Sequence, residues 1–306
     1  MRIIFMGTPA FAVPTLLKLY DSGFTIPAVI TAPDKLGGRG KKEWLISAVK
    51  EAALALNIPV LQPTNLKNES FLHSVNDLKP DLFVVVAFRM LPELLWSLPP
   101  FGTINLHASL LPDYRGAAPI NWAIINGENT TGVTTFFIRK DIDTGPIILT
   151  KSIEILPEDN AGTLHDHLML SGATLVVDSL KNILDPSFVS TPQIERSNKV
   201  APKLQHETGR IDLARSTTEV LNLIRGLSPF PGAWFPSKLG EIKILGAHVV
   251  NSKVDFLGKC YLSDDKTFIY LKTGDHYISL DNIQIPGKKS IDVKSYLNGN
   301  KANTWF

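Results

Sequence analysis

Three polar residues near the middle of the chain carry the functional groups that acyl transfer needs. Asn105 and His107 end one short apolar run, and Asp143 follows a later one. An amide can bind a developing oxyanion, an imidazole can move a proton, and a carboxylate can hold the imidazole in a useful tautomer. We therefore expect Asn105, His107 and Asp143 to be catalytic.

The spacing of the first two residues supports this expectation. Residues i and i+2 of a strand point to the same side, so Asn105 and His107 would face one pocket. A lone histidine at a strand end is more often structural, and a lone aspartate in a turn is usually solvated. The alternative that Asn105 and His107 only satisfy each other and a loop backbone stays open, and the pairing with Asp143 argues against it.

Two loops beside these residues are candidates for holding a flat heterocycle, because each combines apolar side chains with a rigid turn. One loop continues directly from the histidine and consists of Ser109, Leu110, Leu111 and Pro112. The other follows a valine-rich run and consists of Phe88, Arg89, Met90, Leu91 and Pro92. Loop packing is the ordinary explanation of such a segment taken alone.

The elements that position these residues alternate between two kinds. Strand-like runs cover 3–6, 28–31, 82–87 and 103–106, and helical stretches cover 46–57 and 70–78. This alternation predicts an α/β fold with parallel strands and crossover helices. The run 82–87 has no polar alternation, which indicates a central strand buried on both faces. Ligands of such sheets bind outside the carboxyl ends of the strands, where Asn105 and Phe88 would converge.

Beyond residue 184 the composition and the hydrophobic periodicity of the sequence change. An amphipathic helix over 161–184 is followed by a polar stretch, 190–208, that predicts a structureless linker. From residue 209 a helix at 217–227 precedes short runs separated by glycines, which is typical of a small barrel. We expect a catalytic domain over 1–189, a linker over 190–208 and a β-barrel domain over 209–306.

The net charge and the residue composition of the chain exclude several classes of protein. Thirty-one Lys and Arg against 29 Asp and Glu give a charge of +2, so any nucleic-acid contact must be local. The single cysteine, Cys260, excludes an intramolecular disulfide and a cysteine-rich metal site, and fits a reducing compartment. His165 and His167 lie on a predicted helix, where i and i+2 diverge, so we expect no metal site. Without a signal or membrane-length run, a cytoplasmic protein is expected.

One segment is both glycine-rich and basic, and it contains Arg39, Lys41 and Lys42. It lacks the spacing of a P-loop, and no strand leads directly into it. A long basic loop suits a nucleic-acid backbone, where each cation releases counterions. A solvated flexible loop remains the alternative. The N-terminal Gly7 opens only part of a dinucleotide fingerprint, which argues against NAD binding.

Taken together, these segments resemble the methionyl-tRNA formyltransferase family almost from end to end. The resemblance rests on Asn105-x-His107 with the Ser-Leu-Leu-Pro run, on Tyr114 to Pro119, and on Asp143-Thr144-Gly145. Thr31-Ala32-Pro33-Asp34 before the basic loop is similar to the start of that family's tRNA-contacting loop. Gly209 to Asp212 is similar to the opening of its C-terminal domain.

The resemblance implies that 10-formyltetrahydrofolate donates its formyl group to the α-amino group of methionine on initiator tRNA, for translation initiation. It implies a Rossmann-like catalytic domain and an OB-like C-terminal domain that helps to hold the tRNA. The folate would lie over the two loops named above. The tRNA would meet Lys35, Arg39, Lys41 and Lys42. The family usually has Ala-Tyr-Gly where this chain has Ala87-Phe88-Arg89, a departure that bears on the contacts to the folate ring.

Two rival functions remain at this point. A formyltransferase acting on a small amine, such as an amino sugar nucleotide or glycinamide ribonucleotide, would need neither the basic loop nor the second domain. A non-catalytic RNA-binding protein would have no use for the set Asn105, His107 and Asp143. We expect a monomer that binds initiator methionyl-tRNA and the folate donor and uses no metal.

Overall fold

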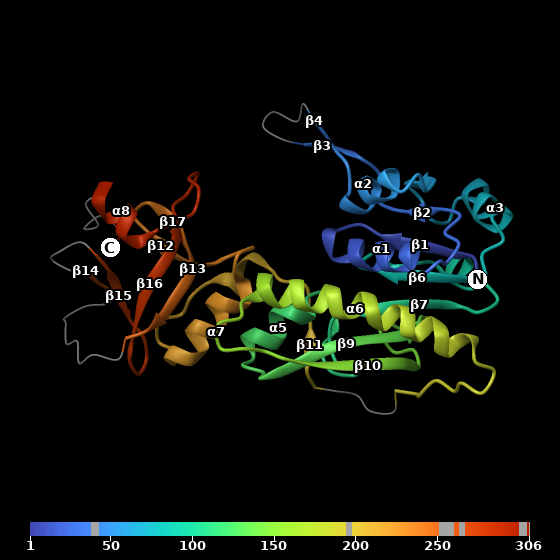
Figure 1. Cartoon of the computed structure of the whole chain (residues 1–306). Helices are drawn as coiled ribbons and strands as arrows, with labels where there is room; N and C mark the ends of the chain where they lie inside the picture. Colours follow the sequence, from blue (N-terminus) through green and yellow to red (C-terminus); the bar gives the residue numbers. More distant parts are fainter. Residues whose placement is uncertain (38–42, 194–197, 251–259, 263–266, 300–304, 306) are drawn as a thin grey trace. The chain divides into compact units, whose positions relative to one another are not determined.

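The computed structural model describes residues 1–37, 43–193, 198–250, 260–262, 267–299 and 305. The chain forms two compact units (Figure 1). Unit 1 consists of Met1–Gly116, Thr131–Glu154 and His165–Val200. Unit 2 consists of Ala117–Thr130, Ile155–Leu164 and Ala201–Phe306. Each unit therefore draws on more than one stretch of the sequence.

Unit 1 is built on a seven-stranded sheet with the order β10-β9-β7-β6-β1-β2-β5. The strands are β1 (Ile3–Gly7), β2 (Val29–Ile30), β5 (Val60–Leu61), β6 (Leu82–Val86), β7 (Thr103–His107), β9 (Thr130–Phe137) and β10 (Ile147–Glu154). The pairs from β5 through β7 are parallel, and β9 is antiparallel to β7. The predicted α/β fold with a mostly parallel sheet is confirmed.

Helices cover both faces of this sheet. They are η1 (Ala10–Ala12), α1 (Val13–Asp21), α2 (Ala48–Ala55), α3 (Glu69–Asp77), α4 (Glu93–Trp96) and α6 (Ala161–Leu184), and a hairpin of β3 (Lys35–Gly37) and β4 (Glu43–Leu45) follows β2. The long α6, yellow-green in Figure 1, contacts the face of β7 that carries Leu106. A Cβ on Gly172 of α6 would lie 2.6 Å from a methyl of Leu106, so glycine permits this close approach.

The opposite face of the sheet carries the candidate site. Asn105 is in register with Val85 of β6, and Val85 belongs to a cluster with Val75 of α3 and Leu95 of α4. Because partners in a parallel ladder point to the same side, Asn105 and His107 lie on the face that α3 and α4 cover. No residue of β6 is more than 3% exposed, as predicted for a strand buried on both faces.

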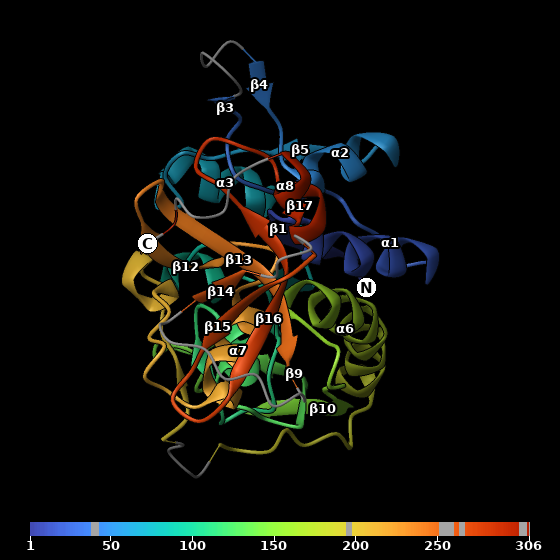
Figure 2. The ribbon, with the colours of Figure 1, turned by 90° about the vertical axis from the view of Figure 1, so that its left-hand side faces the viewer.

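Unit 2 is β-rich. Its elements are α5 (Pro119–Ile125), η2 (His206–Gly209), α7 (Thr217–Leu227), β12 (Ala233–Ser237), β13 (Gly240–Val249), β14 (Cys260–Leu262), β15 (Ile269–Lys272), β16 (Tyr277–Gln284), β17 (Ile291–Asp292) and α8 (Val293–Gly299). The strands form an antiparallel sheet in the order β12-β13-β16-β15-β14, with β17 added to β16. Figure 2 shows β13, β16 and β15 side by side. Burial raises the pKa of the Cys260 thiol in β14 to about 11.

The core of unit 2 follows from alternation along its strands. Ala233 and Phe235 of β12 and Ile242 and Ile244 of β13 are at most 3% exposed and pack against α7 residues such as Ile224. The residue between the first two, Trp234, points to the other side of the sheet. Helix α7 begins at a capping box, in which the Ser216 hydroxyl and the Glu219 carboxylate each accept from the other residue's backbone N–H.

The stretch 190–208 holds more order than the sequence predicts. Thr191 forms a bridge with Ile147 in unit 1, β11 (Val200–Ala201) follows, and η2 ends the stretch. The expectation of a structureless segment is wrong for these residues, while its role as a linker stays a prediction. None of the described helices is long and apolar enough to cross a membrane.

Candidate active site

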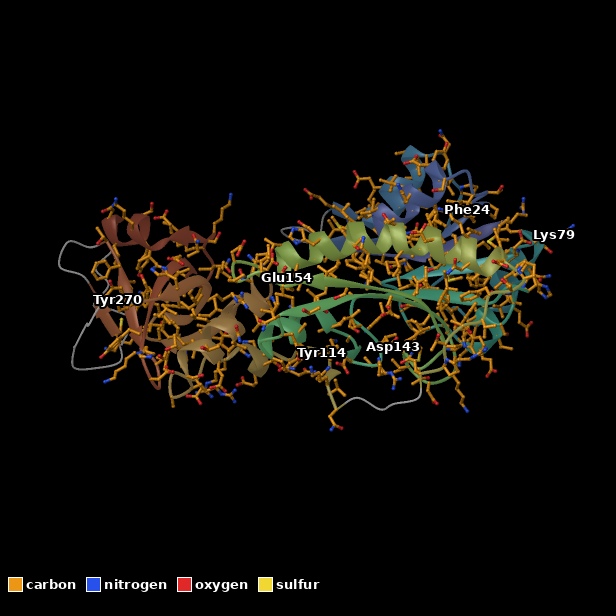
Figure 3. The ribbon with its side chains drawn as sticks, turned by 60° about the horizontal axis from the view of Figure 1, so that its bottom comes forward. Phe24, Lys79, Tyr114, Asp143, Glu154 and Tyr270 are labelled. Atoms are coloured by element: carbon orange, nitrogen blue, oxygen red, sulfur yellow. The ribbon has the colours of Figure 1, made fainter. Side chains whose placement is uncertain are left out.

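His107, the last residue of β7, is 8% exposed and both of its ring nitrogens face oxygen atoms. The Nε2–H donates to the carbonyl oxygen of Tyr114 at 2.9 Å. The Nδ1 atom lies 3.8 Å from Oδ2 of Asp143. Tyr114 and Asp143 are labelled in Figure 3. The structure therefore brings together two of the three predicted catalytic residues, from segments 36 positions apart.

The two residues that face His107 share an uncommon backbone conformation. Tyr114 has φ 58° and Asp143 has φ 53°, both in the left-handed region that favours glycine. Strain of this kind persists only where the surroundings fix the residue. The Asp143 carboxylate is also fixed, because its Oδ2 accepts the Gly116 N–H at 3.0 Å. Both oxygen atoms around His107 are thus held in place by other parts of unit 1.

Part of this support comes from residues on either side of 194–197, which sequence reasoning missed. The carbonyl of Lys199 accepts the Tyr114 N–H at 2.7 Å. The amide of Gln193 donates to the carbonyls of Asp143, at 3.1 Å, and Gly145, at 2.6 Å. The Gln193 oxygen in turn accepts from the Arg115 guanidinium. Gln193 and Lys199 therefore hold the two left-handed residues in the positions that face His107.

Asn105 lies two positions before His107, on the same face of β7, and is partly exposed. Within the described part of the chain its side-chain amide has no hydrogen-bond partner. Of the alternative that Asn105 and His107 only satisfy each other and a loop backbone, the structure shows the bond from His107 to the loop carbonyl of Tyr114, and no hydrogen bond between the described side chains of Asn105 and His107. The Asn105 amide is available for an incoming ligand.

The Ser-Leu-Leu-Pro loop is fixed mainly from within. The Ser109 hydroxyl donates to the Asp113 carbonyl at 2.6 Å, and Ser109 itself is fully buried. Thr134 of β9, the partner of His107 across the sheet, donates to the Ser109 carbonyl and accepts from the Leu111 N–H. A Cβ on Gly132 would lie 2.6 Å from a methyl of Leu110. These contacts fix the loop that directly follows His107, in which Leu110 and Pro112 are partly exposed.

The loop after β6 begins with Ala87 at φ 47°. Phe88 and Leu91 join the apolar cluster on the Asn105 face of the sheet, whereas Met90 is 73% exposed. Arg89 donates to the carbonyls of Pro63 and Thr64 and lies 5.6 Å from the Phe88 ring centre. Arg89 thus fixes a loop that lacks the family's usual glycine. Pro92 follows as the N-cap of α4.

Of the four predicted tRNA contacts, the structure describes Lys35, which is exposed in β3. Arg39, Lys41 and Lys42 lie outside the described residues. The base of this hairpin is firmly held: Lys50 donates to Asp34 at 2.5 Å and to Gln62 at 2.8 Å. The Asp34 carboxylate also accepts from the Gln62 amide at 2.7 Å, and the bonds from Lys50 and then from Gln62 lower the pKa of this carboxyl. In the described ranges no three His, Cys, Asp or Glu side chains form a group that could hold a metal ion.

Comparisons with known proteins agree with this geometry. Residues 1–180 match the formyl transferase family, and residues 203–301 match the C-terminal domain of formyl transferases. A methionyl-tRNA formyltransferase of Flavobacterium johnsoniae is 51% identical, over 98% of this chain and 96% of its own length. The protein of that name from Azobacteroides pseudotrichonymphae is 46% identical over the same shares. The chain belongs to the methionyl-tRNA formyltransferase family.

Solved structures outside this family share the fold. HypX from Aquifex aeolicus is 18% identical with a TM-score of 0.69, over 97% of this chain and 48% of HypX, so the chain spans about half of that protein. The sugar 3N-formyltransferase WlaRD is 21% identical with a TM-score of 0.66, over 94% and 99%. At these identities the likeness concerns the fold alone. Membership of the methionyl-tRNA formyltransferase family rests on the closer relatives.

Proposed function

We propose that the chain transfers the formyl group of 10-formyltetrahydrofolate to the α-amino group of methionine on initiator tRNA. The observation that carries this function is the identity of 43–51% to relatives named methionyl-tRNA formyltransferase, over 98% of the chain. The paired His107 and Asp143, with Asn105 beside them, supply the groups that formyl transfer requires. The chain is therefore a one-carbon transferase of protein biosynthesis.

In the proposed mechanism the neutral α-amine attacks the formyl carbon. A carbon–nitrogen bond forms, and the carbonyl π electrons move to oxygen. The Asn105 amide, which has no described side-chain partner, donates to this oxyanion. The nitrogen of His107 that faces Asp143 is the one left to act on the substrate, because Nε2 is bonded to Tyr114.

Proton transfer completes the reaction. The attacking nitrogen loses a proton to the pair of His107 and Asp143, directly or through a water. Collapse of the intermediate then breaks the bond between the formyl carbon and N10, which takes up a proton as tetrahydrofolate leaves. A distance of 3.8 Å between Nδ1 and the carboxylate is too long for a direct hydrogen bond and leaves both groups free to exchange a proton with substrate.

The donor is proposed to lie on the face of the sheet that carries Asn105. Phe88 and Leu91 form an apolar wall there, and the Ser109 to Pro112 loop follows His107 on the next strand. An apolar wall with a few polar groups is the surrounding that a flat ring requires. The fixed position of Arg89 indicates that this chain forms the wall without the usual glycine.

The experiment that tests the function is incubation of the full chain with labelled 10-formyltetrahydrofolate and one acceptor at a time. Initiator methionyl-tRNA should take the label. Transfer to an amino sugar nucleotide or to glycinamide ribonucleotide, with none to methionyl-tRNA, would establish the small-amine alternative. Absence of transfer to any acceptor would contradict both.

For the acceptor we propose contacts between the tRNA backbone and Lys35, Arg39, Lys41 and Lys42. Arg39→Ala should weaken tRNA formylation at physiological salt and lower the salt dependence of binding by about one phosphate contact. Folate binding should stay unchanged. Lys67→Ala, a change at an exposed lysine elsewhere in unit 1, is the control. Equal losses of folate and tRNA binding would assign the loop to the donor site instead.

We further propose that the enzyme works in the cytoplasm as a monomer, because its acceptor is a large RNA that itself occupies an extended surface. Sedimentation of the purified chain at micromolar concentration tests the oligomeric state. A stable dimer would contradict this part of the proposal alone.

A further inference from the structure

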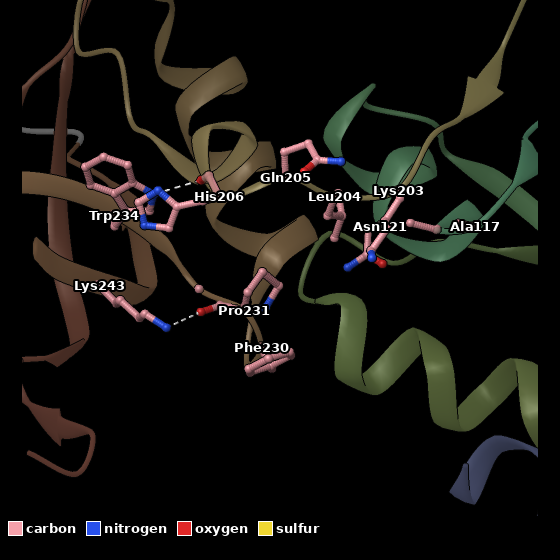
Figure 4. A pocket seen from close by; sticks show the side chains of 13 residues that line it. Ala117, Asn121, Lys203, Leu204, Gln205, His206, Phe230, Pro231, Trp234 and Lys243 are labelled. Carbon is pink, nitrogen blue, oxygen red and sulfur yellow. Dashed lines mark hydrogen bonds between the residues drawn. The ribbon is translucent and has the colours of Figure 1, made fainter. Parts of the chain in front are cut away.

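A pocket of about 460 Å³ lies within unit 2 (Figure 4). Its walls come from α5, from η2 and the residues before it, from the loop after α7, and from β12 and β13. The polar and aromatic residues that line it are Asn121, Lys203, Gln205, His206, Phe230, Trp234 and Lys243. A volume of this size is in the range of sites for small ligands or single nucleotides.

Phe230 has an unusual environment for a phenylalanine. It is 80% exposed, and it stands between Pro229 and Pro231 in the loop that follows α7. A large aromatic side chain in water has a hydrophobic cost that a core residue does not have. At this exposure the ring contributes little to the core of unit 2, and at the rim of the pocket it is accessible to a ligand.

The loop that carries Phe230 is nevertheless rigid. The Gly232 N–H donates to the Leu227 carbonyl at 2.8 Å, and the Ser228 hydroxyl donates to the Leu245 carbonyl at 2.7 Å. The Lys243 ammonium donates to the Pro231 carbonyl at 2.6 Å, a bond drawn in Figure 4. A fixed loop presents its ring at little entropic cost to a ligand.

The charged side chains that line the pocket are cationic, while the carboxylates of Glu207 and Glu241 lie next to it as hydrogen-bond partners of His206. Lys203 and Lys243 both line it, no carboxylate does so among the described residues, and neither lysine forms an ion pair with a described acid. An ammonium group has three donors, and Lys243 uses one of them on Pro231. The remaining donors suit a phosphate.

The other side of the pocket is a second, more protected aromatic surface. His206 stacks on Trp234 with ring centres 4.7 Å apart, and the indole N–H donates to the His206 carbonyl at 3.0 Å. Trp234 and Lys243 are partners in the ladder of β12 and β13, so both point away from the core of unit 2. Strands β12 and β13 and helix η2 thus present aromatic and cationic groups to the same pocket.

From these observations we infer that the pocket binds an unpaired nucleotide of the acceptor RNA, with the base stacked on Phe230 and the phosphate beside Lys203 and Lys243. Aromatic rings with flanking cations are the usual platform for single-stranded nucleic acid. An uncharged or basic small molecule would use the ring but not the two lysines. The inference rests on the proposed function only for the identity of the RNA.

A direct binding experiment tests the inference. The probe is a four-nucleotide single-stranded RNA ending in CCA with a fluorescent label, titrated with the full chain. Phe230→Ala and Phe230→Leu should weaken binding roughly tenfold, and Phe230→Trp should retain it, because the stacked base needs a ring. Lys203→Met and Lys243→Met should each reduce the slope of log affinity against log salt concentration by about one. Phe101→Ala removes a half-exposed phenylalanine in unit 1 and is the matched control.

The outcomes separate this inference from the proposed function. Binding by Phe230→Leu equal to that of Phe230→Trp, or binding of an RNA duplex equal to that of the single strand, would overturn the inference. In formylation assays Phe230→Ala should raise KM for methionyl-tRNA with kcat unchanged. A wild-type chain that binds the single strand through Phe230 but formylates no tRNA would refute the function and leave the subsite standing.

Discussion

The surroundings of His107 in unit 1 and of Phe230 in unit 2 are opposite in almost every respect. His107 is 8% exposed and has an oxygen atom facing each ring nitrogen. Phe230 is 80% exposed, so its ring packs little against the rest of unit 2. The backbone around each of these residues is nevertheless fixed by hydrogen bonds.

The difference follows from what each place has to do. A proton can be moved efficiently only by groups that are oriented beforehand and shielded from water. A large anionic ligand must instead be reached from solvent, so the groups that bind it stay exposed. What the two places share, a fixed backbone, is what lowers the entropic cost of both reaction and binding. Mutations around His107 should therefore change kcat, and those around Phe230 should change KM.

The largest effect is expected at Asn105. Asn105→Ala removes the proposed oxyanion donor and should lower single-turnover formylation roughly a hundredfold to a thousandfold. Affinity for methionyl-tRNA should remain within about twofold, because this amide acts on the transition state. Rapid-quench measurement with saturating tRNA gives both values. Turnover close to that of wild type would remove Asn105 from the mechanism; Asn76→Ala, on the exposed side of α3, controls for general effects.

A smaller effect is expected at Gln193, a positioning residue. Gln193→Met keeps the size of the side chain but removes its bonds to the carbonyls of Asp143 and Gly145. We expect kcat to fall about tenfold, within the range that the loss of two partly buried hydrogen bonds can produce, with KM for tRNA unchanged. The pH profile of kcat should shift as well, because Asp143 would no longer be held against His107. A fall in thermal stability with an unchanged pH profile would mean that Gln193 is merely structural.

The smallest effect is expected at His206 in unit 2. The hydrogen bond that His206 donates to Glu241, and then the one that it donates to Glu207, raise the pKa of His206 above 6.5. The ring also stacks on Trp234, over which the Arg210 guanidinium lies. Because the pKa is raised, the stabilisation from His206 is present below pH 6.5 and is lost as pH rises through the raised value. RNA affinity should fall about twofold over that interval, the small change typical of exposed charges.

NMR titration of the His206 ring measures its pKa, and RNA-binding titrations at each pH measure the affinity. His206→Gln should bind RNA with no pH dependence over this interval. A pH dependence that persists in this variant would assign the titration to another group.

Local patterns in the sequence predicted the helices and strands that depend on periodicity. Helices at 161–184 and 217–227 and the buried strand at 82–86 lie where expected. The strand β9 was missed because three of its buried residues are threonines, which hydropathy treats as polar. Thr134 is bonded to the Ser109 loop and Thr135 to Ser179 of α6, so their hydroxyls are satisfied inside the unit.

The residues of the candidate site were likewise only partly predictable from the sequence. Asn105 and His107 were visible because the chain places them two residues apart on one strand. The parts played by Gln193, Lys199 and Tyr114 were not visible, since two of them act through backbone atoms, which every residue has. The partners of Gln193 and Lys199 lie 48 to 85 positions away along the chain. At such separations a polar segment shows no local sequence pattern that identifies its partner.

The support that Gln193 and Lys199 give to Asp143 and Tyr114 also bears on how the protein is made. A ribosome delivers the chain from its N-terminus, and β7 with His107 emerges long before Gln193 and Lys199. Until those residues arrive, the two left-handed residues beside the histidine lack part of the hydrogen bonding that holds them. A nascent chain that ends at α6 would contain the sheet and its helices without these bonds. The surroundings of the histidine are thus completed only by the last residues of unit 1.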